Sequence, residues 1–391
     1  MSGLMDSSIG PLVPADETLL HQVVDTFAAV GSTDLGWTEK IWAQACASDG
    51  SLQAVFGLGK YVNRNVLDAF GGVSRGDEQW TVRGSRALHV DLESTSVGPL
   101  RYEVAEPLQA VRVILEPNDV QPIAFELELR GVVPARMEDR ELLRAPHGVR
   151  VTNDVVRYHQ TGTASGWIEL EGTRLELVTG EWMSARDHSW GMRTNVGAVP
   201  KDLEPAGYPA TPRSLTSWSP VLMRHADGSE YALFHYFLDT NLPGMPVRRL
   251  RGGIEHSDGR EDPFVDARFE AQFDDTNRRF LGGTITFTHP DGTVRPLAVT
   301  PVSDTGFHLG TGLYFGLDGQ RHGMWRGELH VDGDHIRDCA DPEVARRIHQ
   351  HRDCVVRVED PADGSVGWGP MQTIVIGAFP EYGLTLESTF V

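Results

Sequence analysis

Cysteine is scarce in this sequence: Cys46, Cys339 and Cys354 are the only three among 391 residues. Three is an odd number, and no two of them have the Cys-x-x-Cys spacing, which argues against a disulfide framework and a zinc knuckle. A basic, apolar leader is missing at the N-terminus, and no apolar run is long enough to cross a bilayer. The sequence therefore predicts a cytoplasmic protein with no integral membrane segment.

Positive charge is also in short supply, because 35 Lys and Arg face 55 Asp and Glu and leave a net charge of −20. Such a surface repels polyanions, so nucleic acid is not an expected partner. Several signature motifs are missing as well: there is no P-loop, no Gly-x-Gly-x-x-Gly and no His-Glu-x-x-His. The 15 histidines include no set with the spacing of a zinc site. We therefore expect neither a metal nor a cofactor.

What the sequence does contain is turn residues. Its 42 glycines and 23 prolines separate short runs of β-forming residues. In the second half of the chain, six Asp-Gly pairs begin at positions 227, 258, 291, 318, 332 and 363, between strand-like runs. Asp-Gly favours the tight turns of β-hairpins, and regularly spaced short strands are typical of antiparallel sandwiches and barrels. The sequence therefore predicts a mainly β protein. The predicted strands include 153–160, 165–170, 231–238, 248–255, 264–273, 281–289 and 293–300.

The N-terminal stretch has a different pattern. Apolar Leu19, Val23 and Phe27 recur at helical spacing, which predicts an amphipathic helix over residues 16–30. The aromatic segment Trp37–Trp42 follows and allows two interpretations. It either closes over a cavity or anchors the helix.

Two further features divide the chain. Residues 198–219 contain four prolines and few periodic apolar residues, which makes them the best linker candidate. A second helix is predicted over residues 341–352, because Asp341 is a favoured N-cap and a proline follows it. The resulting domains are a helical segment at 1–52 and two β domains at 53–200 and 201–391.

The segment Glu181–Arg193 holds the densest set of chemically active side chains: two carboxylates, one imidazole, two guanidiniums and two indoles. In an extended strand, Asp187 points to the face opposite to Arg186 and His188. If Asp187 faces a barrel interior, apolar walls raise its pKa and keep it protonated as an acid. The alternative is a structural aspartate that accepts hydrogen bonds from the backbone amides of its own turn, with Arg186 and Arg193 as charge partners.

The motif Arg186-Asp-His-Ser-Trp-Gly191 resembles the His-Asp-His-Asn-(Tyr/Trp)-Gly signature of the carotenoid 1,2-hydratases (hydroxyneurosporene synthases). It resembles more closely the Arg-Asp-(His/Arg)-Ser-Trp-Gly of their AttH-like bacterial relatives. Further similarity lies at residues 57–70, 98–103 and 157–162. This resemblance implies two tandem lipocalin-like (calycin) antiparallel β-barrels with a deep apolar cavity.

The same resemblance implies a cofactor-independent hydratase, dehydratase or isomerase that protonates an alkene in a hydrophobic isoprenoid or terpenoid-like substrate. Asp187 aligns with the proton-donating aspartate, and His188 would position or deprotonate the incoming water. The residues expected to bind substrate are Tyr158, Gln160, Trp182, Trp190, His235 and Tyr236. The rings of Tyr158, Trp182 and Trp190 would stabilise a cation, and Gln160 shares a strand face with Tyr158. His235 and Tyr236 would lie at the junction with the second barrel, although a buried structural histidine also fits position 235.

Two other functions stay open at this point. One is a non-catalytic protein that binds a hydrophobic ligand, and the other is a cyclase or pericyclic catalyst that works by the shape of its cavity. Two departures from the signature bear on the choice, because Arg186 replaces its first histidine and Ser189 replaces its asparagine. If Arg186 pairs with Asp187, the pKa of Asp187 falls and proton donation fails; if their side chains alternate, the acid survives.

Overall fold

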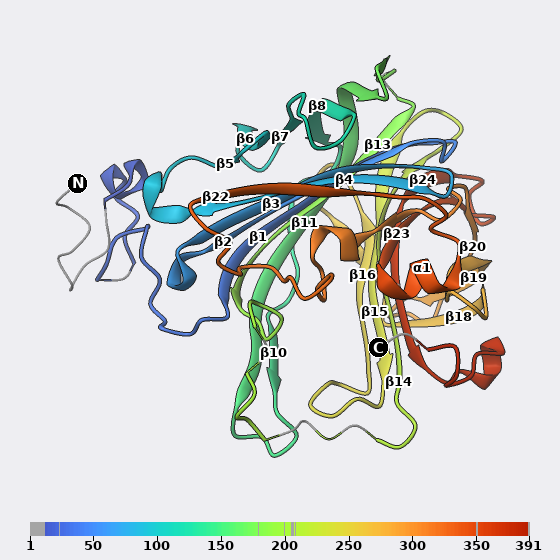
Figure 1. Cartoon of the computed structure of the whole chain (residues 1–391). Helices are drawn as coiled ribbons and strands as arrows, with labels where there is room; N and C mark the ends of the chain where they lie inside the picture. Colours follow the sequence, from blue (N-terminus) through green and yellow to red (C-terminus); the bar gives the residue numbers. More distant parts are fainter. Residues whose placement is uncertain are drawn as a thin grey trace.

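The computed structural model describes residues 12–22, 24–178, 180–198, 200–204, 207, 209–348 and 351–389. These residues form two curled antiparallel sheets, one nearly closed into a barrel and the other curled into a half-barrel (Figure 1). The expected class, mainly β with two tandem lipocalin-like barrels, is confirmed. In the described ranges, no helix has both the length and the apolar composition that a membrane span needs.

The first sheet has 14 strands, and all of its pairings are antiparallel. Its order is β22 (Leu329–Ile336), β4 (Glu78–Ala87), β3 (Val66–Arg75), β2 (Gln53–Tyr61), β1 (Trp37–Ala47), β13 (Trp182–Met192), β11 (Val151–Leu170), β8 (Ile123–Gly131), β7 (Ala110–Leu115), β6 (Leu100–Glu106) and β5 (Ser96–Val97). The short strands β9 (Arg136–Met137), β10 (Glu141–Arg144) and β12 (Thr173–Glu176) pair with β11. Strand β11 is long enough to pair with β13 near its start and with β8 near its end.

The second sheet has 10 strands, again antiparallel. Its order is β17 (Glu261–Pro263), β16 (Arg248–Glu255), β15 (Glu230–Thr240), β14 (Arg213–Arg224), β24 (Val366–Gly377), β23 (Arg352–Glu359), β20 (Val294–Pro301), β19 (Phe280–Thr288) and β18 (Asp266–Phe273), with β21 (Phe307–His308) beside β23. Five of the six Asp-Gly pairs form the expected turns, and the pair at 332 lies inside β22.

Helical structure in the described ranges is limited to short pieces. They are α1 (Pro342–Arg347) and the 3-10 helices η1 (Pro14–Glu17), η2 (Val62–Arg64), η3 (Leu88–Val90), η4 (Leu309–Gly312) and η5 (Pro380–Tyr382). Helix α1 confirms the first half of the helix expected over residues 341–352. The Asp341 carboxylate accepts hydrogen bonds from the backbone amides of Glu343 and Val344, as an N-cap does.

The helix expected over residues 16–30 is wrong. Helix η1 ends at Glu17, and the described residues after it form turns and bends. Val23, one of the residues that suggested the helix, lies outside the described residues. Leu19 and Val24 are fully exposed, so the apolar stripe has no surface to pack against. A short helix needs such packing, because its intrinsic stability in water is marginal.

The stretch 1–52, expected to be helical, also contains β1, which pairs with β2 and β13 in the first sheet. The same sheet includes β22 from the second half of the chain. Gly333 in β22 was expected to form a turn, but a Cβ atom there would lie 2.2 Å from the carbonyl oxygen of Thr81. Glycine therefore allows a close approach of two strands at this position. The division into two domains near residue 200 stays a prediction.

The two sheets meet along the strands that carry the dense motif. Strands β11 and β13 of the first sheet contact β14 and β24 of the second. In β1, Ile41 and Ala43 belong to the core inside the first barrel, whereas Trp42 and Cys46 lie in apolar clusters between the sheets. Both faces of these strands are buried, and each face has its own environment.

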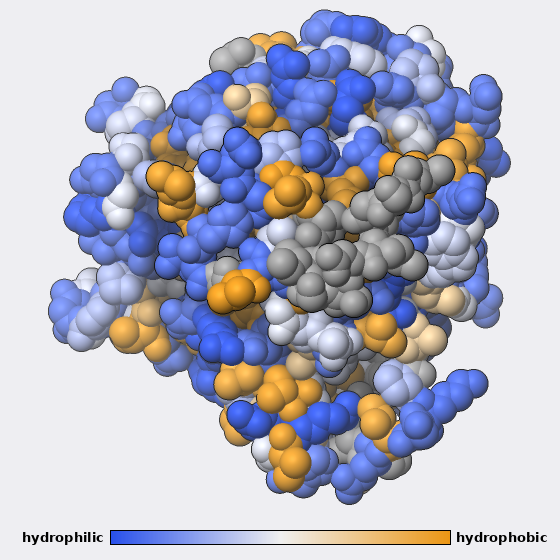
Figure 2. Space-filling model, turned by 90° about the vertical axis from the view of Figure 1, so that its left-hand side faces the viewer, coloured by the Kyte–Doolittle hydropathy of each residue, from blue (hydrophilic) through white to orange (hydrophobic). Residues whose placement is uncertain are grey.

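The outer surface is hydrophilic by comparison. Figure 2 shows polar residues over most of one side of the protein, with apolar residues in small separate groups. Apolar side chains scattered in this way are normal on a protein surface. The functional site is therefore expected inside the barrels or between them.

Candidate active site

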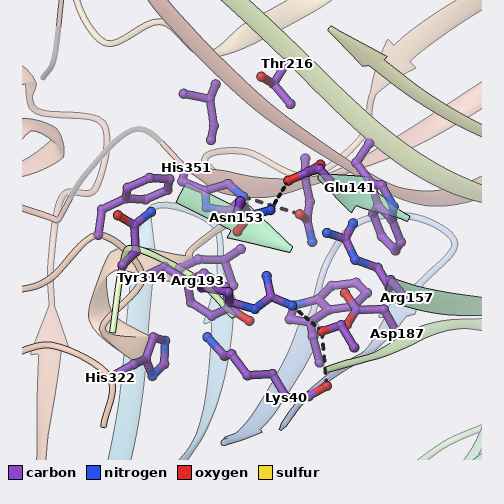
Figure 3. A pocket seen from close by; sticks show the side chains of 18 of the residues that line it. Lys40, Glu141, Asn153, Arg157, Asp187, Arg193, Thr216, Tyr314, His322 and His351 are labelled. Atoms are coloured by element: carbon purple, nitrogen blue, oxygen red, sulfur yellow. Dashed lines mark hydrogen bonds between the residues drawn. The ribbon is translucent and has the colours of Figure 1, made fainter. Parts of the chain in front are cut away.

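A cavity of about 270 Å³ lies between the two sheets. Strands β1, β11 and β13 line it from the first sheet, and β14, β15 and β24 line it from the second. Loop residues 193–196 and residues near η4 complete the wall. Figure 3 shows the labelled side chains converging on this space from both sides.

Strand β13 is a wall shared by two cavities. Asp187 and Ser189 line the cavity between the sheets, whereas His188 lines a second cavity of about 490 Å³ in the first sheet. The alternation expected from the sequence is confirmed, but Asp187 faces the junction of the sheets instead of a barrel interior. Asp187 and His188 are therefore not brought into one cavity.

Asp187 has the environment of an acid. In the described part of the chain, no backbone amide or side chain donates a hydrogen bond to its carboxyl group, so the alternative of a turn-binding aspartate is wrong. Burial raises the pKa of Asp187 above its usual value. Arg157, Arg193 and Lys40 oppose this rise in pKa, and the Glu138 carboxylate adds to it. The net direction is upward, which favours the protonated form.

Arg186 does not pair with Asp187. Its Nε and Nη2 atoms donate hydrogen bonds to Gln160 Oε1 at 2.9 and 2.6 Å, on the opposite face of β13. On that face the Tyr158 hydroxyl lies 3.1 Å from His188 Nδ1, and His188 Nε2 lies 2.7 Å from Glu39 Oε1. The hydrogen bond with His188 lowers the pKa of Glu39. Three predicted residues therefore share one polar network, which is separate from Asp187.

The remaining predicted residues are dispersed. Trp190 lies on the same face as that network, and Trp182 belongs to the core of the first barrel. His235 lies in the core of the second sheet, where its Nε2 is 2.8 Å from Ser217 Oγ. Burial lowers the pKa of His235 to about 3, so it is a neutral structural histidine. Tyr236 does line the cavity between the sheets, as expected of a residue at the junction.

Three cationic side chains accompany Asp187 in the cavity, and two of them are arginines (Figure 3). Arg157 Nη1 lies 3.5 Å from a carboxylate oxygen of Glu138. Arg193 Nη2 donates a hydrogen bond to Ser189 Oγ at 2.7 Å. Arg157 thus has a carboxylate partner, whereas Arg193 binds a neutral hydroxyl.

Lys40 is the third cation, and its side chain is almost fully buried. Its ammonium group lies 4.1 Å from the centre of the Tyr314 ring, within the range of a cation–π interaction. Burial, reinforced by Arg193, lowers the pKa of Lys40 to about 7, although Asp68 and Asp187 oppose this change. At neutral pH the amine can therefore either give or accept a proton.

Aromatic rings form the apolar part of the wall. Trp42 and Trp218, one from each sheet, pack edge to face with their ring centres 5.4 Å apart. Tyr236 and Tyr314 also line the cavity, and burial raises the pKa of both hydroxyls well above the usual value. Both hydroxyls are therefore protonated and can donate hydrogen bonds to a ligand.

A buried ion cluster behind the cavity joins the two sheets. His159 of β11 lies 3.3 Å from Glu138 Oε1 and 2.9 Å from Glu255 Oε1 of β16. Burial alone would lower the pKa of His159, but the two carboxylates outweigh it and raise the pKa to about 9. Trp218 Nε1 donates a hydrogen bond to Glu138 at 3.1 Å, which ties the cluster to the cavity wall.

Lys40, Arg157, Arg193 and Tyr314 were not predicted as site residues. Lys40 does lie in the aromatic segment Trp37–Trp42, for which closure over a cavity was one interpretation, and Trp42 indeed lines the cavity. For Tyr314 the sequence contains no signal, because a loop after η4 brings it to the site. In the described ranges, no three His, Cys, Asp or Glu side chains are grouped so that they could hold a metal ion.

Several proteins of known structure have a similar fold. An AttH-like protein from Nitrosomonas europaea superposes with a TM-score of 0.51 at 12% identity, over 93% of this chain and 98% of that one. The resemblance to the carotenoid hydratase and AttH-like superfamily is thus confirmed at the level of the fold.

Kievitone hydratase from Nectria haematococca matches with a TM-score of 0.46 at 10% identity, over 86% of this chain and 88% of that one. CghA in complex with Sch210972 matches with a TM-score of 0.48 at 13% identity, over 88% and 89%. No curated protein matches the sequence. One family model covers residues 12–385, nearly the whole chain, and the protein therefore belongs to that family, DUF8625, a family of unknown function.

Proposed function

We propose that this protein is a cofactor-independent hydratase, dehydratase or isomerase that protonates a carbon–carbon double bond in the cavity between the sheets. The observation that carries the proposal is the carboxyl group of Asp187. It faces a cavity, accepts no hydrogen bond from the described residues, and has a raised pKa. A carboxyl group whose pKa is raised keeps its proton to a higher pH, which suits it to general acid catalysis.

In this mechanism Asp187 transfers its proton to one carbon of the double bond. Water then adds to the other carbon and loses a proton, which gives an alcohol. If a neighbouring carbon loses a proton instead, the product is an isomer. The neutral amine of Lys40 can accept that proton, because its pKa is about 7 and it lines the same cavity. Lys40 therefore takes the part that the sequence suggested for His188.

The substrate is a largely apolar, unsaturated small molecule. Trp42, Trp218 and Tyr314 present aromatic surface to it, and a cavity of about 270 Å³ suits a compact molecule better than a long polyene. An isoprenoid or terpenoid-like skeleton of that size fits this description. The walls that the two sheets form on either side limit the contact of the substrate with bulk water, which would otherwise capture the cation early.

The test uses a small-molecule extract of the cells that make the protein. We expect wild type to convert one component in heavy-oxygen water into a product that has gained one labelled water, or in heavy water into an isomer that has gained deuterium. Asp187→Asn should slow this conversion by about a hundredfold or more. Asp119→Asn, at an exposed position, is the matched control.

The proposal fails if Asp187→Asn is folded and as active as wild type. It also fails if the product has neither gained an atom from solvent nor lost water, since a cyclase or pericyclic catalyst that works by the shape of its cavity needs no general acid. Cooperative thermal unfolding of the variant at the wild-type temperature shows that it is folded.

A second candidate function is the binding of a hydrophobic ligand without catalysis, and the cavity in the first sheet favours it. That cavity measures about 490 Å³ and has a mainly apolar lining that includes Ile41, Leu58 and Leu67. A neutral fluorescent hydrophobe such as phenylnaphthylamine should bind there. Leu58→Phe should reduce that binding by filling the cavity, while Leu142→Phe, at an exposed site, should not. Equal binding by both variants would exclude this cavity.

A further inference from the structure

Lys40 is a buried cation without an anionic partner. Its side chain lines the cavity and is 9% exposed, yet no described residue forms a hydrogen bond or an ion pair with its ammonium group. The ammonium group instead makes a cation–π contact with the face of the Tyr314 ring. A buried ammonium group normally has a carboxylate or several hydrogen-bond acceptors, because its desolvation is costly.

Arg193 repeats this feature in the same cavity. Its Nη2 atom donates to Ser189, but its Nε atom is buried without an acceptor among the described residues. No described carboxylate lies within 4 Å of its guanidinium group. Other buried arginines have several acceptors. Arg83 contacts the carboxylates of Asp332 and Asp334 at 2.9 and 2.6 Å, and Arg278 donates hydrogen bonds to the backbone carbonyls of Gly377 and Ser388 at 2.8 and 3.2 Å.

Three carboxyl groups lie near these two cations, and none of them forms an ion pair with either. Asp187 is shifted toward its neutral form by burial, and Asp68, which attracts Lys40, accepts a hydrogen bond from the backbone amide of Gly323. Glu141 is engaged elsewhere, because Asn153 donates a hydrogen bond to it and Arg249 lies 3.7 Å away. The cavity therefore has surplus positive charge in a protein whose net charge is −20. A local potential of this sign attracts anions.

We propose that the molecule bound in this cavity is an organic acid whose ionised oxygen, a carboxylate or an enolate, lies between Lys40 and Arg193. Its conjugated carbon skeleton packs against Trp42 and Trp218, beside the acid Asp187. This inference rests on the proposed function and narrows its substrate class from an apolar alkene to an unsaturated acid. With such a substrate Lys40 is protonated, so it holds the ligand oxygen and does not serve as the base. The aromatic wall favours an organic acid over inorganic phosphate.

The proposed reaction is also easier on such a substrate. Protonation of an isolated alkene creates a carbocation, which Lys40 and Arg193 would repel. When the conjugated oxygen is an enolate, protonation at carbon instead gives a neutral carbonyl group, and the negative charge passes to the carboxylate of Asp187. Lys40 and Arg193 stabilise the enolate before this transfer and the Asp187 carboxylate after it. The same residues thus serve binding and chemistry.

The experiment measures binding alone and needs no turnover. Titration calorimetry compares a panel of conjugated acids of increasing size, from sorbate to cinnamate to ferulate, each with its neutral amide, and with inorganic phosphate. For at least one pair, the acid should bind at least about tenfold more tightly than the amide. Lys40→Met and Arg193→Gln should each weaken the binding of that acid by roughly thirtyfold.

Charge-conserving variants and a surface variant serve as controls. Lys40→Arg should retain most of the affinity, and Lys201→Met, at an exposed position, should retain all of it. Asp187→Asn should bind the acid at least as tightly as wild type, because it removes a carboxyl group that repels the acid when ionised. If every amide binds as well as its acid, the proposal is wrong. It is equally wrong if phosphate competes with the acids at equal concentration, since the site would then bind any anion.

The two proposals can fail separately. If Asp187→Asn has wild-type turnover while the ligand acids bind through Lys40, the role of Asp187 as proton donor is wrong and the proposed ligand class is right. If Asp187→Asn is inactive while the ligand acids and their amides bind equally, the role of Asp187 is right and the proposed ligand class is wrong.

Discussion

His159→Gln tests whether a charged histidine fastens the two sheets together behind the cavity. In the wild type, His159 is 1% exposed and lies between Glu138 and Glu255, which come from different parts of the chain. The glutamine keeps the polarity and loses the charge. It also loses the stacking of the imidazole on Phe234, whose ring centre is 3.6 Å away.

The magnitude follows from the two pKa values of His159. The pKa is 6.5 in the unfolded chain and about 9 in the fold. At about 1.4 kcal/mol per pKa unit, the charged histidine stabilises the fold by about 3 kcal/mol. Because the folded pKa is the higher one, this stabilisation is fully present below pH 6.5 and is lost as the pH rises through about 9. Removal of one partner from a buried ion pair typically costs about 3–5 kcal/mol, which agrees.

The assay is urea unfolding followed by tryptophan fluorescence at several pH values between 6 and 10. The difference in unfolding free energy between wild type and His159→Gln should be about 3 kcal/mol at pH 6 and should shrink toward pH 10. The difference matters more than the wild-type curve, because Lys40 acts in the opposite direction. Its pKa falls from 10.5 to about 7 on folding, so it makes the wild type more stable as the pH rises.

A control variant and a refuting result complete this prediction. His256→Gln removes a histidine that is 2.9 Å from Asp262 but partly exposed, and it should change stability by less than about 1 kcal/mol. If the stability difference for His159→Gln stays constant from pH 6 to pH 10, the histidine is neutral in the fold and the reasoning is refuted.

Three further changes have definite expected outcomes. Lys40→Met should stabilise the ligand-free protein by up to about 5 kcal/mol at pH 6. This gain should shrink as the pH rises above 7, because the buried amine of the folded wild type then loses its proton while that of the unfolded chain keeps it; unfolding at pH 6 and pH 10 checks this. Trp218→Phe keeps an aromatic ring but leaves Glu138 without its indole donor, and a loss of about 1–3 kcal/mol is expected in the same assay. Asp341→Ala removes the N-cap of α1 and should cost about 1 kcal/mol, whereas Asp341→Asn should cost less.

The sequence predicted most strands, because turn residues mark their ends. Strand β16 has the predicted bounds, and β15, β18, β19 and β20 differ from prediction by a few residues at most. Strand β11 was predicted as two strands, since Gly162 to Gly166 read as a break. In the structure the strand continues through Gly166, whose φ of 117° is a backbone conformation that glycine adopts easily and other residues rarely adopt. The helix predicted over residues 16–30 failed for a different reason. Apolar residues at helical spacing form a stable helix only if another part of the protein packs against them.

The site could be predicted only in part, and the reason is the burial of β13 on both faces. Alternation correctly separated Asp187 from Arg186 and His188. It could not tell which face looks into a barrel and which faces the second sheet, because both are buried. Lys40, Arg193 and Tyr314 were missed for another reason, because they come from separate segments. The pairing of β1 with β13 sets Lys40 opposite Ser189, to which Arg193 donates a hydrogen bond, and a loop after η4 brings in Tyr314.

The position of the acid depends on the contact between the sheets. In the pairing of β13 with its two neighbours, Asp187 lies opposite Trp42 of β1 on one side and His159 of β11 on the other. Trp42 packs against Trp218 of the second sheet, and His159 contacts Glu255 of the second sheet. A slip of β13 by one residue would turn Arg186 into the cavity and Asp187 into the barrel. A change that loosens the contact between the sheets should therefore abolish the chemistry before it unfolds either barrel.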